Sequence, residues 1–322
     1  MNGRVVVLAP SPQLTITAEE LDGAPDIHLH SGGQGVWQAR MIGSLGVTAV
    51  LCGTVGGETG RVLRPLLDEP GVELHLLEVS GRNGAYLHDR REGNRHEVME
   101  MPADPLHRHE LDDLYEMTLV QALACGIAVL GGPSGDEVVP HSMYRRFTED
   151  LTANGCQVLV DLSGDRLSAA LEGGPSVVKV SHEELITDDR AGGDELTDLV
   201  AAAREIAKHG PHTVVVSRAA EPALALVDGE LFTLHVPELQ PVDPRGAGDS
   251  MTAGVAAALA CGESMADALR LGGAAGAMNV TRHGLGTGSG AAIRAMADRV
   301  ELRPIREHTE NGKNGPPDGA NS

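Results

Sequence analysis

The sequence predicts an α/β protein with a doubly wound, mostly parallel sheet and a second, smaller β-sheet. Short apolar runs, such as residues 4–9, are typical of strands that are buried on both faces of a parallel sheet. Segments of helical period alternate with such runs, which is the pattern of a doubly wound fold. Other segments alternate polar and apolar residues, which is typical of a sheet with one exposed face.

Both kinds of strand occur in the first third of the chain. The pattern predicts an apolar strand at 4–9, alternating segments at 14–17 and 26–30, a glycine-opened helix at 33–46, a strand at 47–52 and a helix at 59–68. Further alternating segments lie at 72–79, 85–88 and 96–101. We expect the smaller sheet to be drawn from about residues 11–31 and 72–101.

After residue 110, helices and strands alternate regularly. Helices are expected at 110–124, 141–154, 167–171 and 196–209, and strands at 127–130, 158–161, 177–180 and 213–217. A hairpin at 223–227 and 231–236 turns at Asp228-Gly229, and helices follow at 265–280 and 290–299. In such a sheet, ligands bind beyond the carboxyl ends of the strands. We expect one domain over 1–306 and a disordered tail at 307–322, which is rich in Gly, Asn and Pro.

The composition excludes some classes of function. The formal net charge is −21 and there are only three lysines, which argues against a basic surface for nucleic acid. An anionic substrate would therefore have to be held by a local site. The four cysteines have no metal-type spacing, no segment is long and apolar enough to span a membrane, and no signal peptide is indicated. We expect a cytoplasmic protein that binds neither nucleic acid nor membranes.

The most informative stretch is a glycine-rich loop at 242–254. Pro244 disfavours a helix before it, Gly246 and Gly248 permit a tight turn, and apolar residues then recur at helical spacing. Free N–H groups at the start of a helix form an anion site that would attract a phosphate. Asp249 is badly placed there for holding an anion but well placed for taking a proton, so it is a candidate general base. The alternative is that Asp249 is a helix N-cap.

Two motifs together resemble the signatures of the PfkB (ribokinase-like) family of carbohydrate kinases. One is the loop at 242–254, and the other spans 31–40 and continues through 45–46 to 53–60. They lie in the family's order, the resemblance covers the chain from about residue 5 to 300, and it is closest to the phosphosugar-kinase branch that includes 1-phosphofructokinase. The resemblance implies a ribokinase-like fold, a small sheet that forms a lid over the sugar, and a homodimer through the lid strands.

This resemblance also implies roles for the loop. Asp249 would take the proton from the substrate hydroxyl, and the N–H groups of Gly246, Ala247 and Gly248 would hold the transferring phosphoryl group like an oxyanion hole. Arg245 lies next to this cradle and could add charge-assisted bonds to a substrate phosphate. A solvated surface arginine is the alternative for Arg245.

ATP and Mg²⁺ are the cofactors that the resemblance implies. The segment 178–185 resembles the family's site for the nucleotide phosphates and the metal, with Lys179 and the metal-binding Glu184 in place and Ser181 where the family has asparagine. An acidic first helical turn is the alternative for Glu184. Further positions assigned to the nucleotide are Ser217, Arg218 and Asn279, the last of which could instead make ordinary local bonds.

The acceptor half departs more from the family pattern. Gly32 and Gly33 are kept and would let the backbone approach a sugar closely. Thr15 stands for a sugar-contacting aspartate, Gln34 for a lysine and Trp37 for an asparagine. Trp37 could stack on a sugar or a base, or pack in the core. Gly84 stands where phosphosugar kinases often have a phosphate-binding arginine, and the candidate substitutes are Arg40, Arg82, Arg90 and Arg91.

Two histidine pairs, His28/His30 and His107/His109, invite a metal interpretation. Neither pair has a convincing set of acidic or cysteine partners at ligand spacing along the sequence, so we expect exposed or hydrogen-bonded imidazoles.

The leading hypothesis is an ATP- and Mg²⁺-dependent kinase that phosphorylates a hydroxyl of a sugar or sugar phosphate. One alternative is a nucleoside kinase, because the same scaffold accepts nucleosides and Trp37 could stack on a base. The other is a catalytically degenerate regulator that binds a nucleotide or metabolite.

Overall fold

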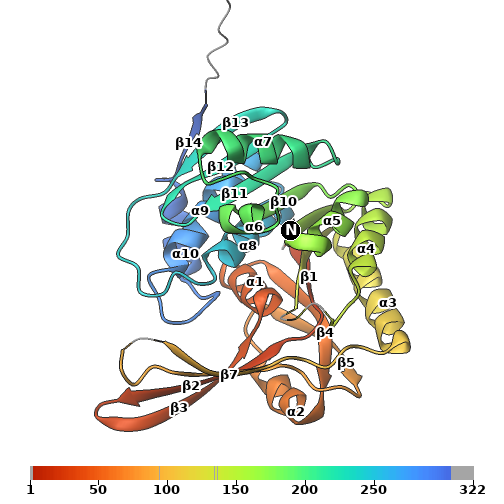
Figure 1. Cartoon of the computed structure of the whole chain (residues 1–322), viewed down its shortest axis with the longest axis vertical. Helices are drawn as coiled ribbons and strands as arrows, with labels where there is room; N and C mark the ends of the chain where they lie inside the picture. The colour runs from red at the N-terminus through yellow and green to blue at the C-terminus, as the bar shows by residue number, and fades with distance from the viewer. Residues whose placement is uncertain (1–2, 94, 134, 136, 306–322) are drawn as a thin grey trace, which may run out of the picture.

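Two β-sheets organise the chain in the computed structural model, which describes residues 3–93, 95–133, 135 and 137–305 (Figure 1). The larger sheet has ten strands and the smaller has four. The segment 307–322, for which we predict disorder, lies outside the described residues.

The large sheet is parallel through its centre, as predicted. Its parallel strands lie in the spatial order β5 (Val72–Val79), β4 (Thr48–Gly56), β1 (Arg4–Ala9), β8 (Ile127–Gly131), β9 (Gln157–Asp161), β10 (Val177–Ser181) and β11 (Thr213–Arg218). Antiparallel strands extend it at one edge: β12 (Glu221–Val227), β13 (Glu230–His235) and β14 (Glu301–Pro304).

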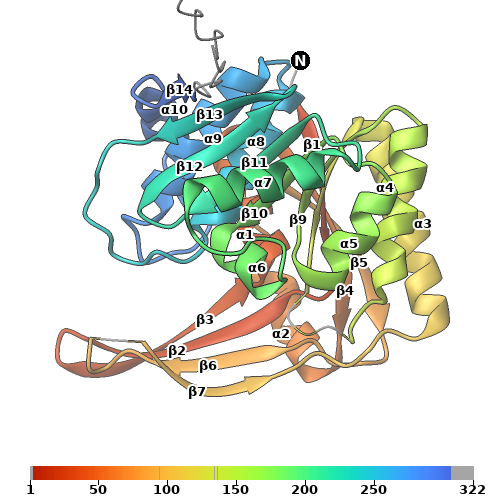
Figure 2. The same ribbon diagram turned by 45° about the horizontal axis from the view of Figure 1, so that its top comes forward.

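Helices cover both faces of this sheet (Figure 2). Alternate residues of β1 show the two layers, because Val6 and Leu8 belong to one apolar cluster while Val5 and Val7 belong to the other. The first cluster includes residues of α3 (Arg108–Cys125), α4 (His141–Ala153), α5 (Gly164–Glu172), α6 (His182–Thr187) and α7 (Leu196–Ala207). The second includes residues of α1 (Gln34–Ser44), α2 (Gly57–Leu66), α8 (Ala247–Ala260), α9 (Met265–Asn279) and α10 (Gly290–Ala297). The doubly wound prediction is therefore confirmed.

The small sheet projects from the main body of the molecule (Figures 1 and 2). Its strand order is β3 (Ala24–Gly32), β2 (Gln13–Leu21), β6 (Ala85–Asp89) and β7 (His96–Met101). Cross-strand register pairs Thr15 with Tyr86 and Thr17 with His88, so one face is polar. The opposite face is apolar and open, with Ile27 68% and Met99 62% exposed.

One expected strand of the small sheet lies elsewhere. The segment β5 (Val72–Val79) is the edge strand of the large sheet, where it pairs with β4 in parallel. Its residues are only partly buried, and a half-buried edge strand produces the same alternation as a strand of a two-stranded or four-stranded lid. The short elements α6 and β14 were not among the expected segments, although a helical first turn was the alternative given for Glu184.

The described helices include none that combines the length and the apolar character needed to cross a lipid bilayer.

Candidate functional site

The glycine-rich loop ends at the start of helix α8. Gly246 is the N-cap and has a φ of 70°, a left-handed conformation that favours glycine. Asp249 is therefore the third residue of the helix, and the interpretation of Asp249 as the N-cap is wrong. The first intrahelical bond runs from Ser250 N–H to Gly246 C=O at 2.9 Å, which leaves the preceding N–H groups free of helical partners.

Lys179 lies directly against this helix start. A Cβ atom added to Gly248 would collide with Nζ of Lys179, so the ammonium group is in contact with the backbone of the cradle. The same Nζ donates to Oδ1 of Asp161 at 3.0 Å. Burial alone would lower the pKa of Lys179, but the carboxylates of Asp161, Glu184 and Asp249 together raise it. A permanent positive charge thus sits beside the free N–H groups.

Asp161, which the sequence analysis did not single out, holds this centre together. It ends strand β9, its side chain is only 2% exposed, and strand register places it beside Lys179. Its Oδ2 accepts from Nε2 of Gln38 at 3.0 Å and from Oγ1 of Thr252 at 2.7 Å. An acid at the end of an apolar strand was the signal in the sequence that could have identified it.

The carboxyl group of Asp249 is largely surrounded by protein, although part of the residue is exposed to solvent. Its residue surface is partly exposed, while burial and the nearby charge of Asp161 raise the pKa of its carboxyl well above the ordinary value. Lys179 and a hydrogen bond from Gln34 oppose this shift. A carboxylate with a raised pKa is a stronger proton acceptor, so the environment suits a general base.

Gln34, expected at the substrate, lies between Asp249 and the end of strand β8. Its Oε1 accepts from Gly132 N–H at 2.7 Å, and its side chain also bonds to Asp249. Trp37 follows one turn later on α1 and faces a cavity described below. One helix therefore reaches both Asp249 and the cavity.

Ser181 and Glu184 form a capping box at the start of α6. Ser181 Oγ accepts from Glu184 N–H at 3.1 Å, and Glu184 Oε2 accepts from Ser181 N–H at 2.7 Å. Glu184 therefore has the structural role in a first helical turn that was the alternative to metal binding. Glu184 still lies near enough for its charge to act on both Lys179 and Asp249. One carboxylate beside a phosphate cradle suits Mg²⁺, which binds through one or two carboxylates plus phosphate oxygens.

The other residues assigned to the nucleotide lie at two places, the carboxyl end of strand β11 and a buried position at the end of helix α9. Ser217 pairs with Ser181 in register at the carboxyl ends of β11 and β10, and Arg218 follows it. Asn279 is buried, where its Nδ2 donates to Arg245 C=O at 2.6 Å and its Oδ1 accepts from Gly286 N–H at 2.9 Å. These bonds make Asn279 a positioning residue for the glycine-rich loop.

A cavity of about 220 Å³ lies between the polar face of the small sheet, helix α1 and the loop after α9. We call it the acceptor cavity. Its wall includes Thr15 and Trp37, while Gly33, with a φ of 101°, caps helix α1 beside it. Arg245 is half-exposed and is held by Asp243 through Nε at 3.1 Å and Nη2 at 3.1 Å.

The structure separates the candidate substitute arginines. Arg40 and Arg90 line the acceptor cavity, and so does Arg95, which the sequence analysis did not consider. Arg82 and Arg91 are exposed and pair with Asp104 and Asp89 instead.

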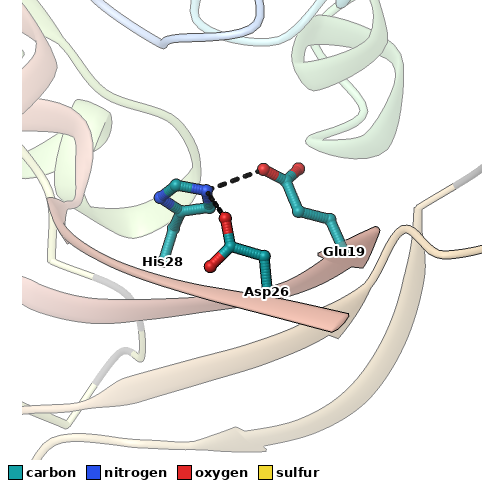
Figure 3. A group of neighbouring side chains, drawn as sticks. All are labelled: Glu19, Asp26 and His28. Carbon is teal, nitrogen blue, oxygen red and sulfur yellow. Dashed lines mark ion pairs between the residues drawn. The ribbon is translucent and has the colours of Figure 1, made fainter. Parts of the chain in front are cut away.

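His28 has the acidic partners that sequence spacing did not reveal (Figure 3). Its Nε2 lies 2.9 Å from Oε1 of Glu19 and 3.0 Å from Oδ2 of Asp26. The hairpin register pairs Glu19 with Asp26 across strands β2 and β3, and His28 lies two residues along on the same face. The imidazole is hydrogen-bonded, as we expected, while the expectation that it lacked acidic partners is wrong.

Comparison with known proteins gives a consistent result. The model of the pfkB family carbohydrate kinases matches residues 6–291. The 1-phosphofructokinase of Bacillus subtilis (strain 168) is 26% identical over 258 residues, which cover 80% of this chain and 84% of the relative. The crystal structure of phosphofructokinase-2 from Escherichia coli in complex with potassium has a TM-score of 0.79 at 27% identity, covering 92% of this chain and 98% of that one. Ribokinase from Arabidopsis thaliana, complexed with ribose and ATP, shares the fold with a TM-score of 0.72 at 19% identity over 92% of this chain and 99% of that one.

Proposed function

This chain belongs to the PfkB family of carbohydrate kinases, and on that premise we propose that it transfers a phosphoryl group from ATP to a hydroxyl of a sugar or sugar phosphate with Asp249 as general base. The single observation that carries the proposal is the juxtaposition at the start of α8. There a carboxylate with a raised pKa, a row of free N–H groups and a buried ammonium group meet.

Each group at this centre has a distinct task. Asp249 accepts the proton of the attacking hydroxyl, which becomes a better nucleophile as the proton leaves. The N–H groups of Gly246, Ala247 and Gly248 donate to the oxygens of the transferring phosphoryl group, where charge is spread in the transition state. Lys179 adds a fixed positive charge that needs no reorganisation during the reaction.

Asp161 keeps Lys179 in place rather than contacting the reacting atoms. Gln38 and Thr252 donate to one oxygen of the carboxylate, and its other oxygen accepts from Lys179, whose ammonium group lies against Gly248. The nucleotide phosphates would then meet Lys179 and Glu184, with Ser217 and Arg218 at the neighbouring strand end. A magnesium ion bound through Glu184 would screen the charge of these phosphates.

The acceptor enters from the other side. Helix α1 supplies Gln34 to Asp249 and Trp37 to the acceptor cavity, so an acceptor in that cavity would direct one hydroxyl towards Asp249. Gly32 and Thr15 form the adjoining wall, where a Cβ at residue 32 would lie 2.5 Å from Oγ1 of Thr15. A side chain at position 32 would therefore displace the Thr15 hydroxyl from the wall.

A substrate panel tests the proposed function. Sugars, sugar phosphates and nucleosides are assayed for ATP consumption with Mg²⁺, with the Asp249→Asn variant measured in parallel. We expect turnover of a sugar or sugar phosphate that the variant loses. Turnover of nucleosides alone would support a nucleoside kinase, and ATP binding without turnover of any acceptor would support a regulator.

We also propose a homodimer through the apolar face of the small sheet. That face exposes large apolar side chains on both edge strands of the small sheet, which a second copy would cover (Ile27 and Leu29 on β3, Met99 on β7). Sedimentation should give a dimer for the wild type and a monomer for Ile27→Lys. A monomeric wild type at working concentration would contradict the proposal. The four free cysteines and the use of ATP support a cytoplasmic location.

A further inference from the structure

The acceptor cavity carries positive charge in a chain whose formal net charge is −21. Its wall contains Arg40, Arg90 and Arg95, against the single acidic side chain of Glu19. Glu19 is engaged by His28 (Figure 3). Since the average field of the protein repels anions, this local excess of positive charge needs an explanation of its own.

Arg40 does not contribute to that excess. Its guanidinium binds both carboxylate oxygens of Glu69, with the shortest contact at 2.5 Å, and also donates to Leu285 C=O at 2.8 Å and Ser31 Oγ at 3.0 Å. Arg40 is therefore a structural residue that joins α1 to its surroundings.

Arg90 is only partly neutralised. Its Nη2 lies 2.6 Å from Oδ2 of Asp243, but Arg245 shares the same carboxylate at 3.1 Å. Two guanidinium groups thus have one acid between them, and the set keeps a net positive charge. Burial raises the pKa of Asp243, but the hydrogen bonds of Arg245 and the charges of Arg245 and Arg90 lower it by more. Asp243 is therefore ionised at neutral pH and stays paired with both guanidinium groups.

Arg95 has no carboxylate partner among the described residues. Its guanidinium lies over the ring of Tyr86, 4.6 Å from the centroid, and its buried Nε has no hydrogen-bond partner. Burial and the neighbouring charges of Arg245 and Arg90 hold the pKa of Arg95 below its usual value, although arginine stays charged. Stacking on the ring fixes the orientation of the guanidinium before any ligand arrives.

His88 adds a second unsatisfied nitrogen to the same wall. Its side chain is only 2% exposed, Nε2 bonds to Oγ1 of Thr17 at 3.1 Å, and Nδ1 has no partner in the described chain. Burial, together with the charges of Arg95, Arg90 and Arg245, lowers the pKa of His88 to about 4, so the ring is neutral at neutral pH. A buried nitrogen without a partner is costly unless a ligand satisfies it.

From these observations, and resting on the proposed kinase function, we propose that the acceptor carries an anionic group, such as a phosphate, which Arg95 and Arg90 bind at the β6–β7 hairpin with His88 beside them. Gly84 stands where phosphosugar kinases often have a phosphate-binding arginine, and a side chain at this position would be crowded in this chain. A Cβ at Gly84 would lie 3.1 Å from Met101 C=O and 3.2 Å from Ala103 N, both backbone atoms that cannot move aside cheaply. The anion site lies at the opposite end of the same strand.

The fluorescence of Trp37 provides a test that does not depend on turnover. Trp37 is the only tryptophan of the chain and it lines the acceptor cavity. At constant ionic strength, the protein is titrated with inorganic phosphate, fructose, fructose 1-phosphate, fructose 6-phosphate and a panel of other sugars and their phosphates. The variants are Arg95→Gln, Arg95→Lys and, as a matched control, Arg91→Gln, because Arg91 lies on the same hairpin but pairs with Asp89 outside the cavity.

We expect at least one sugar phosphate to bind about tenfold or more tightly than its neutral sugar. Arg95→Gln should weaken that binding by a factor of about 10 to 100, the range for a charge-assisted hydrogen bond, without changing the affinity for the neutral sugar. Arg95→Lys should restore part of the loss, and Arg91→Gln should bind as the wild type does.

Three results would overturn the proposal: neutral sugars that bind as tightly as their phosphates, no saturable response to inorganic phosphate or to any phosphorylated sugar, or an Arg95→Gln variant of equal melting temperature and unchanged affinity. The Asp249→Asn variant should bind the phosphorylated acceptor normally. Binding with no turnover by the wild type would contradict the proposed kinase function while leaving the anion site supported.

Discussion

The proposed phosphoryl-transfer centre, at the start of α8, and the acceptor cavity are built in different ways. The centre consists of main-chain N–H groups and buried charges at the ends of central strands. Gly246 has a left-handed conformation there, and a side chain at Gly248 would collide with Lys179. The cavity is formed by side chains of the small sheet, α1 and a loop. Under the proposed function, phosphoryl transfer depends on backbone geometry and buried charges, while selectivity depends on the side chains of the cavity wall.

The largest effect should come from removing the base. Asp249→Asn keeps the size and hydrogen-bonding shape of the side chain but cannot accept the proton, so kcat should fall by on the order of a hundredfold or more. Nucleotide affinity, measured by direct titration, should stay within about twofold. Asp267→Asn, at an exposed position in α9, serves as the control. Near-normal turnover would remove Asp249 from the mechanism.

The same variant should not lose stability. The pKa of Asp249 is raised in the folded protein, so folding favours its protonated form. The free energy of unfolding from this group is highest below the ordinary carboxyl pKa and falls as pH rises through the raised value. At neutral pH, Asp249→Asn should therefore melt at the same temperature as the wild type or higher, as measured by calorimetry. A lower melting temperature at neutral pH but not at pH 4 would contradict the raised pKa.

The next effect tests the charge beside the cradle. Lys179→Met should lower kcat/KM by about tenfold or more, since it removes a fixed charge from the transferring phosphoryl group. Because Lys179 also lowers the pKa of Asp249, its loss should move the acidic limb of the pH–rate profile to higher pH. Lys208→Met, at an exposed position, is the control. An unshifted acidic limb would show that Lys179 does not act on the base.

A smaller effect connects the two regions. Arg90 and Asp243 are 19% and 4% exposed and link the small sheet to the glycine-rich loop. A double-mutant cycle with Arg90→Gln and Asp243→Asn should give a coupling of about 1–2 kcal/mol in thermal or denaturant unfolding. The exposed pair Arg91–Asp89 should give less than about 1 kcal/mol. Since the pKa of Asp243 is lowered, the coupling should be present at neutral pH and be lost as pH falls below the ordinary carboxyl range. Equal couplings for both pairs would mean that burial does not strengthen this link.

The smallest effect concerns the wall of the acceptor cavity. Trp37→Phe keeps an aromatic side chain but removes part of its surface, so the KM of the acceptor should rise about two- to fivefold with little change in kcat. The KM for ATP should not change. If kcat fell instead, Trp37 would act on the reaction centre, and the separation between the two regions would be less sharp than we describe.

Most of the large sheet could be predicted from the sequence, because buried parallel strands and amphipathic helices leave clear periods. Strand β5 could be recognised but not placed, since a half-buried edge strand has the same alternation as a strand of the small sheet. The N-cap of α8 could not be predicted either. It depends on the left-handed conformation of Gly246, and residue spacing does not show which glycine of the loop adopts it. Asp249 consequently lies three residues further from the cap than the structural alternative required.

Candidate site residues could be recognised in local motifs but not where they depend on distant pairings. Asp249, Lys179 and the glycines lie in short signatures that made them candidates, and the structure brings them together at the start of α8. Asp161 meets Gln38 and Thr252 only through the fold, across separations of 123 and 91 residues. Likewise, the partners of His28 and the isolation of Arg95 follow from strand register and from which acids other arginines bind. Such facts cannot be read from spacing alone.

In the proposed mechanism, one carboxylate activates a hydroxyl of an acceptor held in the cavity beneath the small sheet. A crystal structure with a non-hydrolysable ATP analogue and the best acceptor of the panel would show both ligands together. We expect the reacting hydroxyl about 2.6–3.2 Å from a carboxylate oxygen of Asp249, with the terminal phosphate at the N–H groups of residues 246–248. An acceptor bound elsewhere, or Asp249 turned away from it with both ligands present, would rule out Asp249 as the base.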